Sequence, residues 1–298
     1  MNKGIWLAAA AYGVWGFFPV YWKLLKHVPA LQLLGHRIGW SFILLVMVLF
    51  VSHRWEDFRQ AIASRRIQRT YLAAAILIGI NWLTYVWAVN AGFIVETSLG
   101  YFINPLVSVL LGVIILKEKI RTWQWMAIGL VAVGVLYLTF SYGSLPWIAL
   151  TLAFTFAFYG FVKKTAPLNS IQGLTLETGI LFLPSIGWLI FSEVRGDGAF
   201  LHSGWVADFM MIGAGLVTTI PLLMFASAAK LIPLSMVGIL QYIAPTIQFL
   251  IGVLVYHEPF TSSRVIGFSI VWIALLIFGI EGWVVRRSNK RAALSRAS

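Results

Sequence analysis

The stretch SLGYFINPLVSVLLGVIILKEK at residues 98–119 has a counterpart 140 positions later, GILQYIAPTIQFLIGVLVYHEP at residues 238–259. At this offset Pro105 falls on Pro245 and Glu118 on Glu258 without a gap. Self-similarity at a fixed offset is typical of a duplicated structural unit. Both stretches are long, apolar and free of polar alternation, which favours membrane-spanning helices over barrel strands.

The composition of the whole chain agrees with a membrane protein. Of its 298 residues, 60% are hydrophobic and 11% are charged, whereas about a quarter of the residues in a soluble domain are charged. A spanning helix needs about 20 apolar residues. The sequence therefore predicts an all-α membrane protein with ten transmembrane helices. The expected spans are 4–22, 32–51, 71–90, 96–116, 122–140, 146–162, 172–191, 208–228, 233–255 and 264–284.

The duplication sets the expected topology. Each copy holds five spans, an odd number, so the second copy is expected to lie upside down relative to the first. With both termini in the cytoplasm, 17 of the 22 Lys and Arg residues fall on the cytoplasmic side, as the positive-inside rule requires. We expect two inverted repeats at 1–140 and 141–285, followed by a basic cytoplasmic tail at 286–298. Alternating-access transporters use such inverted repeats.

Several chemistries are not expected. The chain has no cysteine, so disulfides and thiolate metal sites are excluded. It lacks a P-loop, a G-x-S-x-G motif and an H-E-x-x-H motif. The net charge of +12 follows the expected topology, so we expect no nucleic-acid partner. We predict a protein that is not an enzyme and has neither cofactor nor metal, with membrane lipids and a small-molecule substrate as its partners.

The fourth and ninth spans carry the most informative pattern. Small or polar residues recur every four positions at Gly100, Asn104, Ser108 and Gly112. Such stripes often serve helix packing alone, so a packing role and a binding role both remain open. The proline in each span removes a helical hydrogen bond and frees a carbonyl group. Paired breaks in corresponding spans point to a site at the repeat interface.

Polar and aromatic side chains in the spans predict a chamber for a planar, amphiphilic or amino-acid-like solute. Asn81 and Tyr85 share one helix face. The expected substrate-binding residues are Trp15, Asn81, Trp82, Tyr85, Tyr101, Asn104, Gln241 and Tyr242, and Tyr21 and Tyr159 complete the chamber. The expected coupling or gating residues are Arg37, Glu177, Pro105, Pro221 and Pro245. Tryptophans at span ends, including Trp6, Trp22, Trp147, Trp205 and Trp283, are expected to be interfacial anchors.

Arg37 and Glu177 occupy equivalent positions of the two copies. Because the copies are inverted, their backbones should differ in depth by about 12 Å, so a direct ion pair is not expected. Arg37 could extend to the outer interface, and Glu177 could extend inward near Lys163 and Lys164. Alternatively, Glu177 is a protonatable group that couples transport to protons.

At these residues the chain resembles the EamA family of the drug/metabolite transporter superfamily, most closely its RarD branch. The resemblance rests on 98–106 and on shorter matches at 10–16, 36–37, 81–90, 154–160, 217–221 and 241–246. It implies ten helices in two inverted EamA repeats around a central cavity. It also implies a permease of the bacterial inner membrane that exports or exchanges small metabolites or drugs. A channel, or an assembly partner that transports nothing, remains an alternative.

Overall fold

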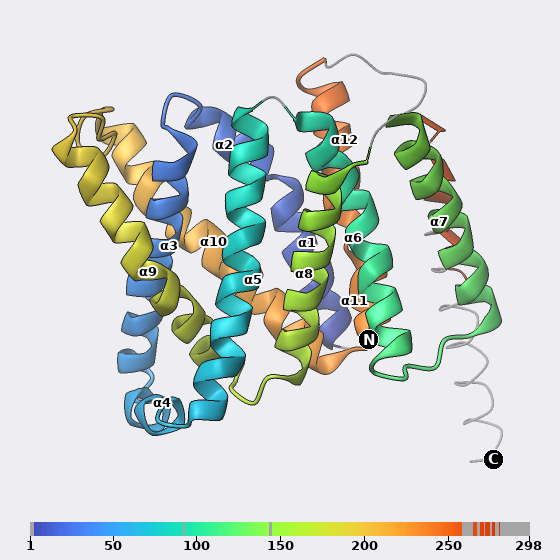
Figure 1. Cartoon of the computed structure of the whole chain (residues 1–298), viewed down its shortest axis with the longest axis horizontal. Helices are drawn as coiled ribbons and strands as arrows, with labels where there is room; N and C mark the ends of the chain where they lie inside the picture. Colours follow the sequence, from blue (N-terminus) through green and yellow to red (C-terminus); the bar gives the residue numbers. More distant parts are fainter. Residues whose placement is uncertain are drawn as a thin grey trace, which may run out of the picture.

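The computed structural model describes residues 3–91, 93–142 and 145–257 and, beyond them, residues 265–266, 269–270, 272–274, 276–277 and 280 (Figure 1). Most of the predicted tenth span, together with Glu258, Trp283 and the tail at 286–298, lies outside the described residues. The helices are α1 (Lys3–Gly16), α2 (Phe18–Leu24), α3 (Ala30–Val51), α4 (Trp55–Ile62), α5 (Arg65–Asn90), α6 (Ile94–Ile114), α7 (Thr122–Tyr142), α8 (Trp147–Thr165), α9 (Ser170–Val194), α10 (Trp205–Leu231), α11 (Leu234–Leu240) and α12 (Ile243–Leu254).

All regular structure in the described part of the chain is helical. Within the described residues, seven segments are long and apolar enough to cross a membrane, with α1 and α2 counted together and α11 and α12 counted together. The sequence predicted ten. Of the other three, α7 and α8 lie beside the seven (Figure 1), and the tenth lies mostly outside the described residues.

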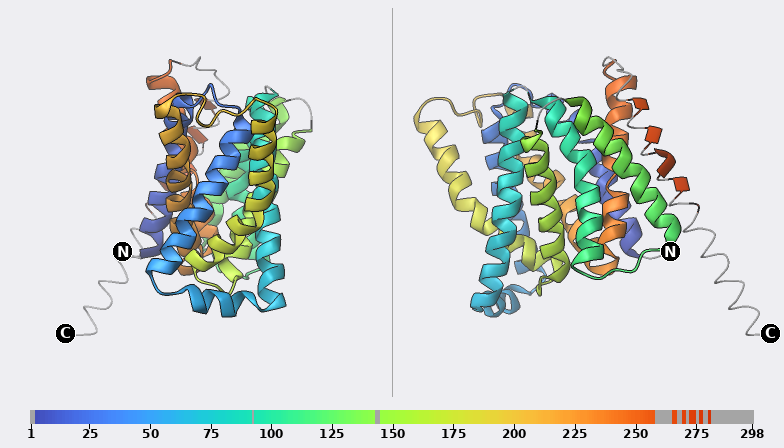
Figure 2. Two further views of the ribbon diagram at one scale, coloured as in Figure 1. Left: turned by 90° about the vertical axis from the view of Figure 1, so that its left-hand side faces the viewer. Right: turned by 45° about the vertical axis from the view of Figure 1, so that its right-hand side comes forward.

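The helices stand side by side, with α9 and α7 at opposite edges of the view (Figure 1). Turned by 90°, the bundle has two layers, with α10 and α12 in one and α5 and α8 in the other (Figure 2). Helices at matching positions of the two halves of the sequence run in opposite directions: α3 descends in Figure 1 while α9 rises, and α5 rises while α10 descends.

The contacts between helices follow a regular scheme. In the first half, α1 packs on α10 and α12, and α3 packs on α9 and α10. In the second half, α8 packs on α5 and α6, and α9 packs on α3 and α5. Nearly every major contact therefore joins helices from different halves of the sequence, so the space between the halves lies at the centre of the bundle.

Glycines bring some of these helices unusually close together. A Cβ atom on Gly215 in α10 would lie 2.6 Å from the Trp40 carbonyl carbon in α3. Next to it, the Ser41 hydroxyl donates a 3.0 Å hydrogen bond to the Gly215 carbonyl. Likewise, a Cβ atom on Gly238 in α11 would lie 2.7 Å from the Pro105 carbonyl oxygen in α6. Small residues at helix crossings allow this backbone approach.

The structure corrects the expectation of paired breaks at Pro105 and Pro245. The helix α6 continues through Pro105, and α10 continues through Pro221. Of the corresponding fourth and ninth spans, the ninth alone is interrupted within the described residues, at Gln241 and Tyr242 between α11 and α12. A proline cannot donate to the carbonyl four residues earlier, which for Pro245 is that of Gln241. In α6 the proline at position 105 removes the donor to the Tyr101 carbonyl in the same way, yet the helix stays continuous and packs on both α8 and α11.

Two connections are more ordered than the sequence suggests. The helix α4 lies across the lower end of the bundle in Figure 1, and the side chain of its Phe58 is buried. The connection between α9 and α10, which contains three glycines, is held by Gln32. Its side chain donates a 2.7 Å hydrogen bond to the Asp197 carbonyl and accepts one of 2.8 Å from the Ala199 amide.

Candidate functional site

A cavity of about 230 Å³ lies between the two halves of the sequence. Among the described residues that line it, aromatic side chains are the largest group, and the others include amide and hydroxyl groups and one charged side chain, that of Arg37. The lining residues are Tyr12, Trp15, Phe18, Pro19, Trp22, Arg37, Asn81, Trp82, Tyr85, Gly100, Tyr101, Asn104, Leu152, Phe156, Thr218, Leu222, Gln241, Ala244, Pro245 and Gln248. They come from α1, α2, α3, α5, α6, α8, α10 and α12 and from the break after α11.

The breaks in two spans shape this cavity. The turn at Phe17 separates α1 from α2 and places Phe18, Pro19 and Trp22 on the wall. The interruption after α11 brings Gln241 to the wall. Polar groups at membrane depth are tolerated where they line a cavity, which accounts for the position of this amide.

Arg37 does not extend to the outer interface, as one expectation had it. Its side chain points into the cavity, where Nε donates a 3.1 Å hydrogen bond to the Thr218 hydroxyl. The guanidinium lies 4.9 Å from the ring centres of both Trp22 and Trp82. A cation is attracted to the faces of aromatic rings, and more strongly where water is scarce. Trp22, expected to be an interfacial anchor, thus belongs to the cavity.

Amide side chains connect the cavity wall to neighbouring helices. Asn81 Nδ2 donates hydrogen bonds of 2.9 Å to the Leu152 carbonyl and of 3.0 Å to the Thr155 hydroxyl, both in α8. Gln248 Nε2 donates a 3.1 Å hydrogen bond to the Trp15 carbonyl. The Asn81 amino group is therefore used within the protein, so its carbonyl oxygen is the atom with capacity left for a solute.

Most of the residues predicted from the sequence lie together on this wall. Those that line the cavity are Trp15, Arg37, Asn81, Trp82, Tyr85, Tyr101, Asn104, Gln241 and Pro245. Tyr242 does not line it: its side chain is buried, and its hydroxyl donates a 2.9 Å hydrogen bond to the Phe102 carbonyl. Pro105 and Pro221 lie inside helices and do not line the cavity. The roles assigned to all of these residues stay predictions.

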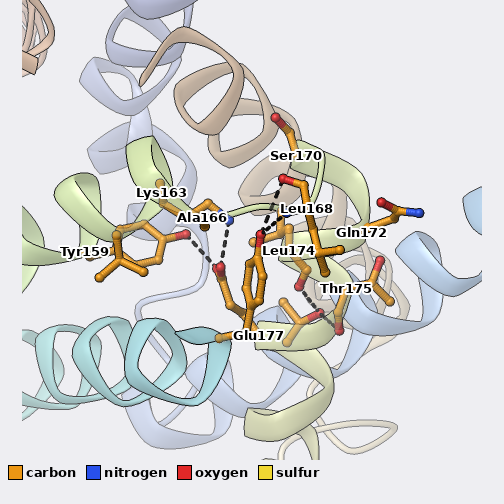
Figure 3. Close-up of polar contacts among 12 residues, drawn as sticks. Tyr159, Lys163, Ala166, Leu168, Ser170, Gln172, Leu174, Thr175 and Glu177 are labelled. Atoms are coloured by element: carbon orange, nitrogen blue, oxygen red, sulfur yellow. Dashed lines mark hydrogen bonds and ion pairs between the residues drawn. The ribbon is translucent and has the colours of Figure 1, made fainter. Parts of the chain in front are cut away.

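Glu177 lies outside the cavity, in a buried polar cluster with Lys163 and Tyr159 (Figure 3). Lys163 Nζ is 2.7 Å from Glu177 Oε1, and the Tyr159 hydroxyl donates a 2.9 Å hydrogen bond to Oε2. The side chains of Lys163 and Glu177 are 2% and 1% exposed. The carboxylate is thus fully enclosed and matched by an ammonium group and a hydroxyl, rather than extended toward the interface.

Lysine side chains close the lower end of the bundle by capping helix ends reciprocally. Lys164 of α8 donates hydrogen bonds of 3.1 and 2.7 Å to the Ala229 and Ile232 carbonyls, at the end of α10. Lys230 of α10 donates to the Ala166 and Leu168 carbonyls, just after α8. The last carbonyls of a helix lack intrahelical partners and favour cations, so these contacts hold α8 and α10 together.

Glu118 completes this closed end. It follows α6, and its carboxylate accepts hydrogen bonds of 2.6 Å from the Leu234 amide and 2.9 Å from the Ser235 amide, in the first turn of α11. The Ser235 hydroxyl donates to it at 2.7 Å. Lys164 Nζ lies 3.9 Å away. Glu118 therefore joins the two halves of the sequence below the cavity.

Sequence reasoning missed part of the wall. Tyr12 lies one turn before Trp15, so their shared helix face was the available signal. Thr218 and Gln248 are polar positions inside the expected spans 208–228 and 233–255, but they were not among the predicted substrate-binding residues. No periodicity in the sequence separates Trp22 from the tryptophans at span ends, because its position depends on the turn at Phe17.

Comparison with known proteins identifies the family. Residues 2–140 and 145–280 each match the EamA-like transporter family. The chain is 49% identical to "Uncharacterized transporter YojE" of Bacillus subtilis, with 97% of each chain covered. It is 43% identical to "Protein RarD" of Streptomyces exfoliatus, covering 98% of this chain and 91% of that one. A crystal structure at 16% identity has the same fold, with a TM-score of 0.67 over 93% of this chain and 97% of the other.

These matches define a multi-pass membrane transporter of the drug/metabolite type. The chain belongs to the EamA-like transporter family, and the expected resemblance to its RarD branch is confirmed.

Proposed function

We propose that the protein is a secondary active transporter of the bacterial inner membrane that exports or exchanges small metabolites or drugs by alternating access. The observation that carries this proposal is the cavity, because both halves of the sequence line it. Secondary transporters place their substrate sites at such a repeat interface, near the bilayer midplane. Arg37, Asn81, Tyr85, Tyr101, Asn104 and Gln241 would contact the solute, and Trp15 and Trp82 would stack on it.

The topology that we propose has ten spanning helices in two inverted repeats, at 1–140 and 141–285, with both termini in the cytoplasm. The opposite directions of matching helices support it, and so does the contact scheme. The counterparts of α1, α10 and α12 in the other half are α8, α5 and α6. The contacts of α1 with α10 and α12 therefore correspond to the contacts of α8 with α5 and α6. In this orientation the end closed by Glu118 and the lysines faces the cytoplasm.

Coupling to protons through Glu177 is the mechanism we propose to test first. Protonation of Glu177 would remove the charge that matches Lys163 and leave a buried ammonium without its partner, which is unfavourable. Loss of this pair would weaken the junction between α8 and α9. We expect Glu177→Gln to abolish dependence of transport on a proton gradient, and unchanged coupling in that variant would exclude this role.

The transport proposal is tested by a metabolite screen followed by reconstitution. Metabolites exported by cells that overproduce the protein would be compared with those exported by cells that lack it. Each hit would then be loaded into proteoliposomes. A transporter predicts saturable uptake that is stimulated by solute on the opposite side. Flux that rises linearly with concentration would indicate a channel, and the absence of flux for every hit would favour an assembly role.

A further inference from the structure

Arg37 brings a positive charge to the cavity. Among the described residues that line it, Arg37 alone is charged. Its Nε is used by Thr218, and Trp22 and Trp82 flank the guanidinium. No carboxylate lies within 4 Å of it in the part of the chain that the structure describes. The terminal amino groups of a guanidinium are suited to binding a carboxylate through two parallel hydrogen bonds.

Position 177, the equivalent of position 37 in the second repeat, differs in how its charge is matched. Glu177 has its counter-charge within the protein, since Lys163 lies 2.7 Å away and Tyr159 donates a further hydrogen bond. The Arg37 guanidinium, in contrast, lies beside two aromatic rings, and none of the described carboxylates is within 4 Å of it. A buried charge is retained where it is matched by an opposite charge or a ligand. Of these two equivalent positions, 177 carries a charge that is matched within the protein, and 37 carries a charge that a bound anion would match.

The rest of the wall is suited to a small ring. Trp15, Tyr85, Tyr101 and Phe156 present aromatic surfaces, which favour stacked or edge-to-face contact with another ring. The Tyr12 hydroxyl is buried at this wall and has no hydrogen-bond partner among the described residues, so it can bond to a polar atom of a solute. A volume of about 230 Å³ lies below the usual range for drug-sized ligands, about 300–1,000 Å³.

We propose that the cavity binds small aromatic carboxylates, with the carboxylate on Arg37 and the ring among the aromatic side chains. This inference rests on the proposed function, because it takes the cavity to be the transport site. It names the substrate class: organic anions with one planar ring, in preference to neutral or cationic analogues of the same shape.

The experiment measures binding at equilibrium and needs no transport. The purified full chain in detergent is titrated with benzoate, benzamide, benzylamine and cyclohexanecarboxylate, and each dissociation constant is obtained from the rise of the unfolding temperature with ligand concentration. We expect benzoate to bind at least about tenfold more tightly than benzamide, as for a charge-assisted hydrogen bond. Benzoate should also bind more tightly than cyclohexanecarboxylate, which has the charge without the aromatic ring.

Variants of Arg37 test whether this residue causes the preference for benzoate. Arg37→Gln should weaken benzoate to the level of benzamide and leave benzamide unchanged, while Arg37→Lys should keep part of the preference. Arg195→Gln removes one positive charge from an exposed connection and should change nothing. Equal binding of benzoate and benzamide by the native chain, tighter binding of benzylamine, no binding of any probe, or a preference retained by Arg37→Gln would each overturn the inference.

Counterflow of labelled benzoate in proteoliposomes separates this inference from the proposed function. Selective benzoate binding without any counterflow would contradict the transporter and leave the anion site standing. Counterflow of benzylamine or benzamide in preference to benzoate would contradict the anion site and leave the transporter standing.

Discussion

The buried pair of Lys163 and Glu177 allows a quantitative test of how the second half is held together. Three variants form a double-mutant cycle: Lys163→Met, Glu177→Gln and the two combined. Both side chains are almost completely enclosed, so either single change leaves a charge or a donor without its partner. Removing one member of a buried pair costs about 3–5 kcal/mol. In the Glu177→Gln variant, Tyr159 can still donate to the amide oxygen.

The double variant should be less damaged than either single variant. With both charges gone, no ion remains to be desolvated, and replacing a buried pair by neutral groups is often nearly neutral. Thermal unfolding of the purified protein in detergent measures the difference. We expect each single change to lower the midpoint by about 6–20 °C, since 1 kcal/mol corresponds to about 2–4 °C at 150–250 residues.

The combined variant should recover at least half of that loss, which is a coupling energy of several kcal/mol. Losses that simply add, or single variants that unfold within about 1 °C of the native chain, would show that the two charges do not interact as the structure has them. A charge change elsewhere serves as a control: the exposed Arg195 changed to Gln should leave the midpoint unchanged.

Three further predictions follow from packing and topology. In the same unfolding assay, Gly215→Ala should destabilise the protein by about 1–3 kcal/mol, because a Cβ atom there meets the α3 backbone. The control is Gly13→Ala, whose Cβ atom would meet nothing within 4 Å, so this change should be neutral or stabilising. Glu118→Gln should lower the free energy of unfolding by about 1–2 kcal/mol, because it weakens the hydrogen bonds to the first turn of α11. Adding Ser235→Ala to this variant should lower it little further, since both side chains belong to the same contact between α6 and α11. A single cysteine at position 66 should react with an impermeant thiol reagent in inverted vesicles and not in intact cells; labelling in intact cells would reverse the proposed orientation.

Much of the bundle could be predicted from the sequence because lipid restricts the choice. Backbone groups in a bilayer must be bonded within the chain, so apolar runs of sufficient length identify helices. The offset of 140 residues then predicted which helices correspond. The same reasoning could not foresee α4, because its residues are polar and its position depends on burying Phe58.

The cavity was predicted in composition but not in its outline. Asn81, Tyr85 and Tyr101 were found because polar groups in a span must avoid lipid. Tyr242 meets the same criterion, yet its hydroxyl is bonded to the Phe102 carbonyl of α6. Only the packing of α11 and α12 against their neighbours distinguishes these tyrosines. The partner of Glu177 was also open, because Lys163 and Lys164 are adjacent and it is Lys163 that reaches the carboxylate.

The central claim is that one cavity opens to each side of the membrane in turn. Leu222 lines the cavity, so a cysteine in its place reports access from either side in a chain that has no other cysteine. A second variant carries cysteines at positions 118 and 235, and a short bifunctional thiol reagent cross-links them so that the closed end cannot open. The native side chains at these positions, Glu118 and Ser235, are hydrogen-bonded to each other.

The decisive measurement is the reaction of the Leu222→Cys variant with an impermeant thiol reagent, from outside in intact cells and from inside in inverted vesicles. A third protein, carrying all three cysteines, is cross-linked before labelling. The account predicts labelling from both sides when the closed end is free and labelling from outside only once it is cross-linked. Labelling from inside with the cross-link in place, or from one side only in the free protein, would contradict it.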